Sequence, residues 1–176
     1  KHQNYNPRRL DTCQGNFELN ILGGKLINVP NSMRIGIGFD VHPLKTNNPL
    51  IIGGVVIPSS FGSQGHSDGD ALVHAVVDAL LGAAGLGDIG RHFPSTSDKW
   101  KNAPSTYFLK DSVKKIKTSG WKIENIDTIV ILQKPIILEF IPKIKTKLSL
   151  ILQVSEEQMS LKATTTDHLG FIGEEK

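Results

Sequence analysis

Hydrophobic periodicity divides this chain of 176 residues into two parts that meet near residue 33. Residues 1–32 are rich in Asn, Gly and Pro and have no sustained period of 2 or 3.6, so we interpret them as an N-terminal extension with a short hairpin around Gly23-Gly24. From residue 33 onward, short apolar runs typical of strands alternate with segments that have the period of amphipathic helices. The pattern therefore predicts one folded domain over 33–176.

The part from residue 33 onward predicts seven elements in the order β-β-α-α-β-α-β. Runs rich in β-branched residues indicate strands, and apolar residues at i, i+4 and i+7 indicate helices with one buried face. This order is typical of a mixed α/β or α+β sandwich in which helices pack on a sheet. We expect strands over 34–39, 50–57, 126–132 and 160–166, and helices over about 70–85, 105–118 and 142–152.

Composition and charge exclude several classes of protein. No apolar run reaches the roughly 18 residues of a membrane span. The single cysteine, Cys13, excludes an internal disulfide framework and an all-cysteine zinc cluster. Of the net charge of +3, residues 1–32 account for +2, with four basic against two acidic groups. The rest is nearly neutral and lacks the basic surface that binds nucleic acid, so we expect neither a nucleic-acid nor a membrane partner.

Asp40 and His42 are the first candidate metal ligands. They lie two residues apart at the end of the first predicted strand, so a period of 2 puts both side chains on the same face. An isolated pair of this kind is more often a capping Asp beside a solvated His. The pair therefore needs a third ligand from elsewhere in the chain before it indicates a metal site.

A ladder of polar residues at steps of four supplies that ligand: His66, Asp70, His74 and Asp78. A polar stripe facing solvent is the simpler interpretation of the ladder. Apolar neighbours such as Val77, however, put His74 and Asp78 at the margin of a buried helix face, where a polar group needs a partner. A metal ion would satisfy His74, and Asp78 would then orient the His74 ring.

Asp40, His42 and His74 together form a set of one oxygen and two nitrogen ligands. Three protein ligands with one open position is the pattern of catalytic zinc, whereas structural zinc sites close with four. Two further segments can contact phosphate or a hard metal ion: the glycines between 53 and 69, through backbone amides, and the Thr-Thr-Thr-Asp run at 164–167. Turns and an exposed edge strand are the simpler interpretations of these two segments.

Taken together, the motifs resemble those of the 2-C-methyl-D-erythritol 2,4-cyclodiphosphate synthase family, of the non-mevalonate isoprenoid pathway. The resemblance covers 33–176 and leaves 1–32 outside. The segments that carry it, in order, are GFDVH at 38–42, IIGG at 51–54, HSDGD at 66–70, DALLGA at 78–83, GDIG at 87–90, FP at 93–94 and KATTT at 162–166.

The resemblance implies a mixed β-sheet with helices packed on one face, assembled as a homotrimer with active sites between subunits. It implies an enzyme, a phosphorus–oxygen lyase that converts 4-diphosphocytidyl-2-C-methyl-D-erythritol 2-phosphate into the cyclic 2,4-diphosphate and releases CMP. In this reaction the 2-phosphate attacks the β-phosphorus, so the protein mainly aligns and neutralises phosphates. The implied cofactors are Zn²⁺, held by Asp40, His42 and His74, and a second divalent cation, Mg²⁺ or Mn²⁺, held by Asp167.

The resemblance also implies roles for individual residues. It assigns catalytic roles to His66 and Thr165, and it places the cytosine of the substrate against 132–138 of a neighbouring subunit. The implied substrate-binding residues are Asp40, His42, His66, Ser67, Asp88, Ile89, Gly90, Phe93, Ser95, Ser97, Leu132, Pro135, Ile137, Leu138, Thr164, Thr165, Thr166, Asp167 and Phe171.

The chain departs from the family pattern at several positions. Asp167 stands where the family commonly has Glu, Ser95 and Ser97 replace aspartates, and Ile136 replaces a frequent Lys. Glu174 stands where many members have a basic residue near the trimer axis, and the family's last strand beyond Gly173 is absent from this chain.

Two alternative functions remain open: a zinc-dependent phosphohydrolase with the same triad, and a non-catalytic nucleotide-binding trimer in which zinc is structural. The composition of 1–32 favours the remnant of a plastid-type leader. We therefore expect a plastid or apicoplast location in a eukaryote and a cytoplasmic location in a bacterium.

Overall fold

The computed structural model describes residues 19–22, 25–28 and 33–174, which belong to two compact units divided between residues 34 and 35. In the first unit, β1 (Leu19–Leu22) pairs antiparallel with β2 (Lys25–Asn28). This pairing confirms the hairpin predicted around Gly23-Gly24, although those two residues themselves lie outside the described part. The interpretation of 1–32 as a leader remnant falls largely on residues outside it as well.

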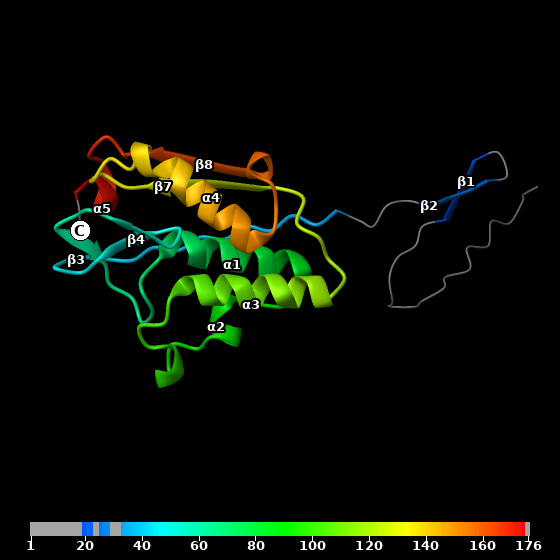
Figure 1. Cartoon of the computed structure of the whole chain (residues 1–176), viewed down its shortest axis with the longest axis horizontal. Coiled ribbons are helices and arrows are strands. Elements are labelled where there is room, and N and C mark those ends of the chain that lie inside the picture. The colour runs from blue at the N-terminus through cyan, green and yellow to red at the C-terminus, as the bar shows by residue number, and fades with distance from the viewer. Residues whose placement is uncertain (1–18, 23–24, 29–32, 175–176) are drawn as a thin grey trace, which may run out of the picture. The chain divides into compact units, whose positions relative to one another are not determined.

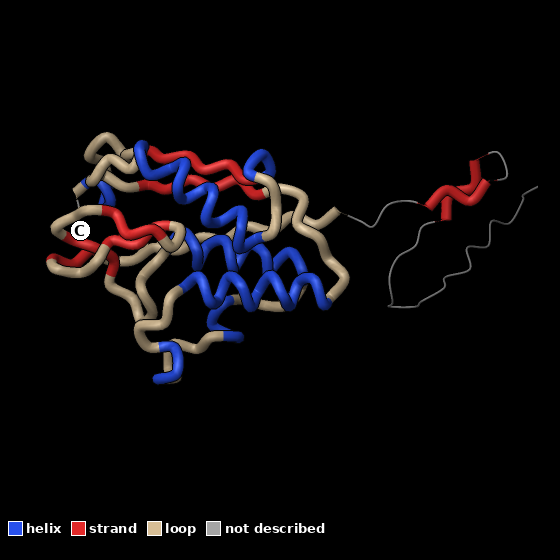
Figure 2. The backbone as a smooth tube through the Cα atoms, in the orientation of Figure 1, coloured by secondary structure: helices blue, strands red, loops and turns tan. Residues whose placement is uncertain are grey.

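The second unit contains the strands and helices that position the candidate site (Figures 1 and 2). Its strands are β3 (Leu44–Thr46), β4 (Leu50–Ile52), β5 (Val55–Ile57), β6 (Phe61–Ser63), β7 (Ile126–Ile131) and β8 (Met159–Thr164). Its α-helices are α1 (Ala71–Ala84), α2 (Ile89–His92), α3 (Ser105–Thr118), α4 (Ile141–Leu152) and α5 (Gly170–Gly173). Short 3-10 turns occupy 98–100, 138–140 and 156–158.

The mixed α/β class is confirmed, but the single mixed sheet was a wrong prediction for the described residues. There the strands pair only in twos: β3 with β6 and β4 with β5 antiparallel, and β7 with β8 parallel. α1 and α3 lie side by side, and α4 packs against β8 (Figure 1). None of the helices in the described part is long and apolar enough to cross a membrane.

Two predicted strands differ from the structure. The run 50–57 is not one strand but a hairpin, because Gly53 and Gly54 adopt φ of 60° and 72° and reverse the chain between β4 and β5. Two consecutive positive φ values are what a tight two-residue hairpin turn of this type requires, and glycine adopts them without steric cost. The segment 34–39 is not assigned to a strand.

The hydrophobic core lies between the three long helices and the strand pairs. α1 buries the apolar stripe predicted from its period, including Val73, Val77 and Leu81. α3 spans the predicted residues and contributes Leu109. Ile144, Leu148 and Leu152 of α4 complete the layer against Leu50, Ile57, Met159 and Leu161. Each such side chain contributes about 1.5–3 kcal/mol of burial free energy, so the core holds the helices firmly in place.

Asp70 joins the β4–β5 hairpin to α1. Its side chain is fully buried, and it accepts hydrogen bonds from the backbone N–H groups of Gly53 at 3.0 Å, Gly54 at 2.5 Å and Val73 at 3.1 Å. The last bond caps the N-terminus of the helix. Burial raises the pKa of Asp70 to about 6, although the three N–H bonds act in the opposite direction.

Residues 35–42 lie against α1 through two glycines. A Cβ atom on Gly36 would stand 1.8 Å from the Ala79 carbonyl oxygen, and one on Gly38 would stand 1.8 Å from the Ala75 carbonyl oxygen. Only glycine lets two backbones approach this closely. The packing carries the next residues, Asp40 onward, to the N-terminal half of α1.

We expect Gly38→Ala to lower the free energy of unfolding by about 1–3 kcal/mol, because either the segment or the helix backbone must move to admit the methyl group. Urea denaturation measures the change. Gly82→Ala is the matched control: Gly82 is exposed on α1 with no neighbouring described atom within 4 Å of an added Cβ. The control should gain about 0.5–1 kcal/mol from higher helix propensity. Unchanged stability of Gly38→Ala would contradict the packing of 35–42 on α1.

Candidate active site

Three predicted metal ligands meet at the N-terminal half of α1. Asp40 Oδ2 lies 3.2 Å from His42 Nδ1 and 3.0 Å from His74 Nδ1. The three candidate ligand atoms all lie within 4.8 Å of one another, and their side chains are 12–24% exposed. The convergence expected of Asp40, His42 and His74 is therefore present in the fold.

The donor set fits a divalent metal ion. One carboxylate oxygen and two neutral ring nitrogens are ligands that borderline-soft metals accept, and three of them leave a coordination position open. The two rings stand with their centroids 5.2 Å apart and tilted by 52°, so both Nδ1 atoms face the same carboxylate oxygen.

The carboxylate of Asp40 is kept ionised by its two neighbours. Burial alone would raise the pKa of Asp40, but the hydrogen bond with His74 and the charges of His42 and His74 outweigh it and hold the pKa below its ordinary value of 3.8. An ionised carboxylate is the form that coordinates a metal, so the side chain is ready to bind at neutral pH.

The other ring nitrogen of His74 contacts two hydroxyls. His74 Nε2 lies 2.8 Å from Ser105 Oγ and 3.0 Å from Ser67 Oγ. The expectation that Asp78 orients this ring was wrong. Asp78 Oδ1 instead accepts a hydrogen bond of 2.7 Å from the N–H of Ile89, at the start of α2. The reason is that the first N–H groups of a helix need an acceptor, and Asp78 lies where α2 begins.

Sequence reasoning missed Ser105 and gave no role to the side chain of Asp68. Ser105 is fully buried, and its backbone N–H donates to Asp68 Oδ2 at 3.0 Å. Its hydroxyl donates to Asp68 Oδ1 in a short hydrogen bond. The only available signals were the HSDGD motif, which contains Asp68, and the position of Ser105 at a predicted helix start. Neither signal indicates that the two residues lie behind His74.

The loop before α1 brings the predicted phosphate contacts next to the triad. Ser67 is buried, and His66 Nε2 lies 3.1 Å from the carbonyl oxygen of Ser97. Gly65 lies against the His42 ring, since a Cβ atom there would stand 2.8 Å from His42 Nε2. Thus Ser67 contacts the candidate ligand His74, and the adjacent His66 contacts Ser97; all three are predicted substrate-binding residues.

The α2 region holds a second set of predicted residues. Asp88 caps α2 by accepting from Arg91 N–H at 2.8 Å, and both Asp88 and Gly90 are exposed. Ser95 is exposed as well. The ring of Phe93, by contrast, is buried and stacks on Phe108 with centroids 4.6 Å apart, so its side chain belongs to the core and not to an open binding surface.

A third set lies at the carboxyl ends of the parallel strands β7 and β8. Leu132 N–H donates to the Thr164 carbonyl at 3.0 Å, which places the predicted cytosine segment 132–138 beside the threonine run. Within that segment Ile137 is buried in the core and Leu138 is 71% exposed. Pro135, which is partly buried, follows a cis peptide bond. The side chain of Ile137 is therefore a core side chain.

The threonine run ends in a turn that presents an exposed carboxylate. Thr164, Thr165 and Asp167 are exposed, while Thr166 Oγ1 donates to the Leu169 carbonyl at 2.8 Å. Asp167 and His168 have φ of 51° and 64°, which is uncommon for residues other than glycine. Two consecutive residues other than glycine with positive φ are a feature of functional loops. On α5, Phe171 is 56% exposed.

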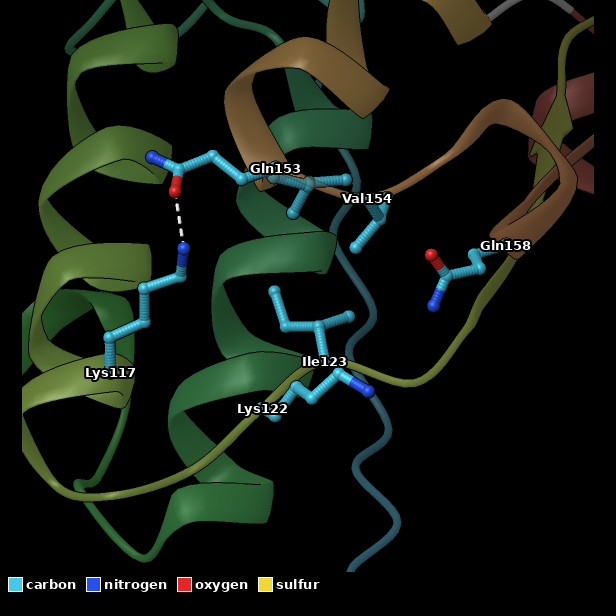
Figure 3. A pocket seen from close by; sticks show the side chains of 7 residues that line it. Lys117, Lys122, Ile123, Gln153, Val154 and Gln158 are labelled. Atoms are coloured by element: carbon cyan, nitrogen blue, oxygen red, sulfur yellow. Dashed lines mark hydrogen bonds between the residues drawn. The ribbon is translucent and has the colours of Figure 1, made fainter.

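A separate cavity of about 340 Å³ lies at the C-terminal ends of α3 and α4 (Figure 3). Lys117, one of its lining residues, is roughly 18 Å along the helix axis from Ser105. Its amine donates to Oε1 of Gln153, another lining residue (Figure 3). The cavity is lined by Lys117, Lys122, Ile123, Leu152, Gln153, Val154 and Gln158, which include none of the triad or of the predicted site residues.

The fold and the triad define a small α/β protein with a three-ligand metal site, and comparison with known proteins identifies the family. A family model described as the YgbB family matches residues 33–176. The chain therefore belongs to the YgbB family.

Individual relatives agree with this assignment. The 2-C-methyl-D-erythritol 2,4-cyclodiphosphate synthase of Desulforamulus reducens is 47% identical over 141 residues, which cover 80% of this chain and 90% of the relative. The structure of the bifunctional IspDF from Campylobacter jejuni is similar at a TM-score of 0.78 and 44% identity, over 81% of this chain and 38% of that one. The CDP complex of IspF from Plasmodium falciparum is similar at a TM-score of 0.71 and 38% identity, over 81% of this chain and 88% of that one.

We expect His74→Ala to lose its metal ion, because the remaining two ligands cannot hold it against dialysis, whereas the wild-type chain keeps about one ion per chain. Elemental analysis after dialysis measures the metal content. His92→Ala is the matched control, since His92 lies on α2, outside the triad, and its ring contacts the Leu86 carbonyl oxygen at 2.9 Å. Full metal content in His74→Ala would contradict the assignment of this ligand.

Proposed function

We propose that the chain is a 2-C-methyl-D-erythritol 2,4-cyclodiphosphate synthase. It converts 4-diphosphocytidyl-2-C-methyl-D-erythritol 2-phosphate into the cyclic diphosphate with release of CMP, as a phosphorus–oxygen lyase of non-mevalonate isoprenoid biosynthesis. The observation that carries the proposal is the convergence of Asp40, His42 and His74 in a chain whose relatives bear this name.

In this proposal, Asp40, His42 and His74 hold Zn²⁺. The ion supplies Lewis acidity and a template that holds a phosphate oxygen in place. Because the attacking group is a phosphate of the substrate itself, the protein has little covalent chemistry to perform and acts mainly by alignment. His66 and Ser67, which lie beside the triad, are the residues that we assign to the reacting phosphates.

The turn at the end of β8 serves the leaving nucleotide. We assign to Thr165 a hydroxyl donor for the phosphates that gain charge in the transition state. The exposed carboxylate of Asp167 holds the second divalent cation, Mg²⁺ or Mn²⁺, since hard cations prefer oxygen ligands. The adjacent segment 132–138 holds the cytosine, largely through backbone groups, in agreement with the CDP found in the Plasmodium falciparum relative.

We further propose that the active protein is a homotrimer with its sites between subunits. The side of 35–42 that faces away from α1 carries apolar side chains that are open to solvent: Ile35 is 86%, Ile37 is 89% and Phe39 is 75% exposed. On β7, Ile129 and Ile131 are also more than 40% exposed. Apolar surface in such quantity marks a protein contact, and a second copy of the chain is the partner we assign to it.

The cellular location follows from the source. Because we assign the chain to this pathway, we propose that it is located in the plastid or apicoplast if its source is a eukaryote, and in the cytoplasm if its source is a bacterium.

The products distinguish the synthase from its alternatives. We expect incubation with the cytidyl diphosphate substrate, Mg²⁺ and ¹⁸O-labelled water to yield CMP and a cyclic diphosphate without the label, as followed by phosphorus NMR and mass spectrometry. The internal phosphate, not water, is the nucleophile in this reaction. A linear phosphate that contains ¹⁸O would instead establish the phosphohydrolase, and bound nucleotide without turnover would establish the non-catalytic trimer.

We expect sedimentation of the wild-type chain to give about three times the 19.2 kDa of one subunit. Ile37→Asp should lower the mass toward that of a monomer, because it places a charge on the proposed contact face while leaving the core of one subunit intact. Leu150→Asp is the matched control, since Leu150 is 74% exposed on α4, away from that face, and should remain trimeric. An active wild-type monomer would overturn the intersubunit site.

A further inference from the structure

Behind the metal triad, a chain of hydrogen bonds runs from His74 through Ser105 to Asp68. His74 Nδ1 faces Asp40, His74 Nε2 lies 2.8 Å from Ser105 Oγ, and the Ser105 hydroxyl donates to Asp68 Oδ1. We propose that Ser105 and Asp68 are positioning residues, which hold His74 in the tautomer and ring orientation that a metal ion requires. The proposal rests on the metal site proposed above.

The direction of the hydrogen bonds follows from the ligand atom. A neutral imidazole that offers the Nδ1 lone pair to a metal carries its proton on Nε2. Nε2–H must then donate, and Ser105 Oγ is the nearer of its two neighbours. Because the Ser105 hydrogen is directed to Asp68, the lone pairs of its oxygen are free to accept. In the opposite tautomer, Nδ1–H would donate to Asp40 and Nε2 would need a donor. Ser105 could not be that donor because its hydrogen is directed to Asp68, so only the Ser67 hydroxyl could donate.

The hydroxyl of Ser67 fits into the same hydrogen-bond network without displacing the bond between His74 and Ser105. Ser67 Oγ lies 3.0 Å from His74 Nε2 and 3.3 Å from Ser105 Oγ. A hydroxyl oxygen accepts two hydrogen bonds and donates one, so Ser105 Oγ can accept from both His74 and Ser67 while it donates to Asp68. Every donor in the cluster then has an acceptor, as a buried polar network requires.

The position of Ser105 is fixed by its surroundings. It is fully buried at the first turn of α3, and its backbone N–H donates to the second oxygen of Asp68 at 3.0 Å. Two backbone bonds join the same loops: Asp68 N–H donates to the Ala103 carbonyl at 3.1 Å, and Asn102 N–H donates to the His66 carbonyl at 2.9 Å. The hydroxyl that His74 meets is therefore held by the fold and not by a mobile side chain.

The carboxylate of Asp68 is the group through which this series of hydrogen bonds strengthens His74 as a metal ligand. Histidines that bind metals usually donate the second ring N–H to a carboxylate or carbonyl, which fixes the ring and makes it a stronger ligand. Here a serine hydroxyl stands between ring and carboxylate and transmits the same polarisation. Loss of such a partner typically weakens metal affinity by about 10- to 100-fold.

Ser105→Ala tests the proposal, with zinc affinity from chelator competition as the readout. We expect zinc to bind about 10- to 100-fold more weakly than in the wild-type chain. The visible absorption of the Co²⁺-loaded protein should also change, because the ring is no longer held in one orientation. Ser112→Ala is the matched control: Ser112 is equally buried on the same helix, and its hydroxyl has no hydrogen-bond partner among the described residues. The control should keep wild-type affinity and spectrum.

Asp68→Asn separates this role from a merely structural one. The substitution keeps the shape of the side chain but removes its charge, so zinc affinity should fall in the same direction. In the double variant with Ser105→Ala, the loss should equal that of Ser105→Ala alone, because Asp68 acts on the metal only through the hydroxyl. Ser105→Thr, which keeps the hydroxyl, should restore part of the affinity. If Ser105→Ala does not fold, the zinc affinities of Asp68→Asn and Ser105→Thr still test the proposal.

The outcomes distinguish this inference from the proposed function. Wild-type zinc affinity and Co²⁺ spectrum in Ser105→Ala, with zinc bound and the cyclic product formed by the wild-type chain, would overturn the positioning role alone. Additive losses from the two substitutions would overturn it as well. A wild-type chain that binds no zinc would overturn both the positioning role and the metal site on which it rests.

Discussion

The buried carboxylate of Asp70 is the interaction on which the arrangement of the site depends. It accepts hydrogen bonds from the N–H groups of Gly53 and Gly54 in the β4–β5 turn, and it caps α1 by accepting one from the N–H of Val73. Without it, three backbone donors would be left without an acceptor, at a cost of about 1–3 kcal/mol for each buried group. Because one side chain serves both elements, the hairpin and the start of α1 cannot move independently. His74 lies one helical turn beyond this fixed point, so its position is set as well.

Carboxylates along α1 and the loop before it connect this helix to three different segments. Asp70 accepts a hydrogen bond from the backbone of the hairpin turn. Asp68 accepts one from the N–H of Ser105 at the start of α3, and Asp78 accepts one from the N–H of Ile89 at the start of α2. In each case a carboxylate accepts from backbone N–H groups that have no partner in their own element. The remaining carboxylate, Asp40, faces two imidazoles instead. Thus three acidic side chains of α1 and the loop before it assemble the scaffold, and Asp40, from a different segment, is left for the candidate metal site.

The helices and the triad could be predicted from the sequence, while the strand pairing could not. α3 spans the residues that its period predicted, and α1 and α4 differ from prediction only at their ends. Helical hydrogen bonds are local, so the local pattern suffices. A strand needs a partner elsewhere in the chain: 34–39 has a β-like composition, yet Gly36 and Gly38 bring its backbone against α1. The run 50–57 is apolar throughout, but its two central glycines turn the chain.

The sequence by itself determined the family, the three helices and the choice of Asp40, His42 and His74 as candidate ligands, because these depend on residue type, local period and motif. Only the tertiary structure decided which groups surround those ligands. Ser105 is 31 positions from His74, and nothing in the spacing of the two indicates their 2.8 Å contact. Asp78, at the right spacing to support His74, binds α2 instead. The physical reason is that a polar side chain pairs with the nearest unsatisfied group, and packing of distant segments decides which group that is.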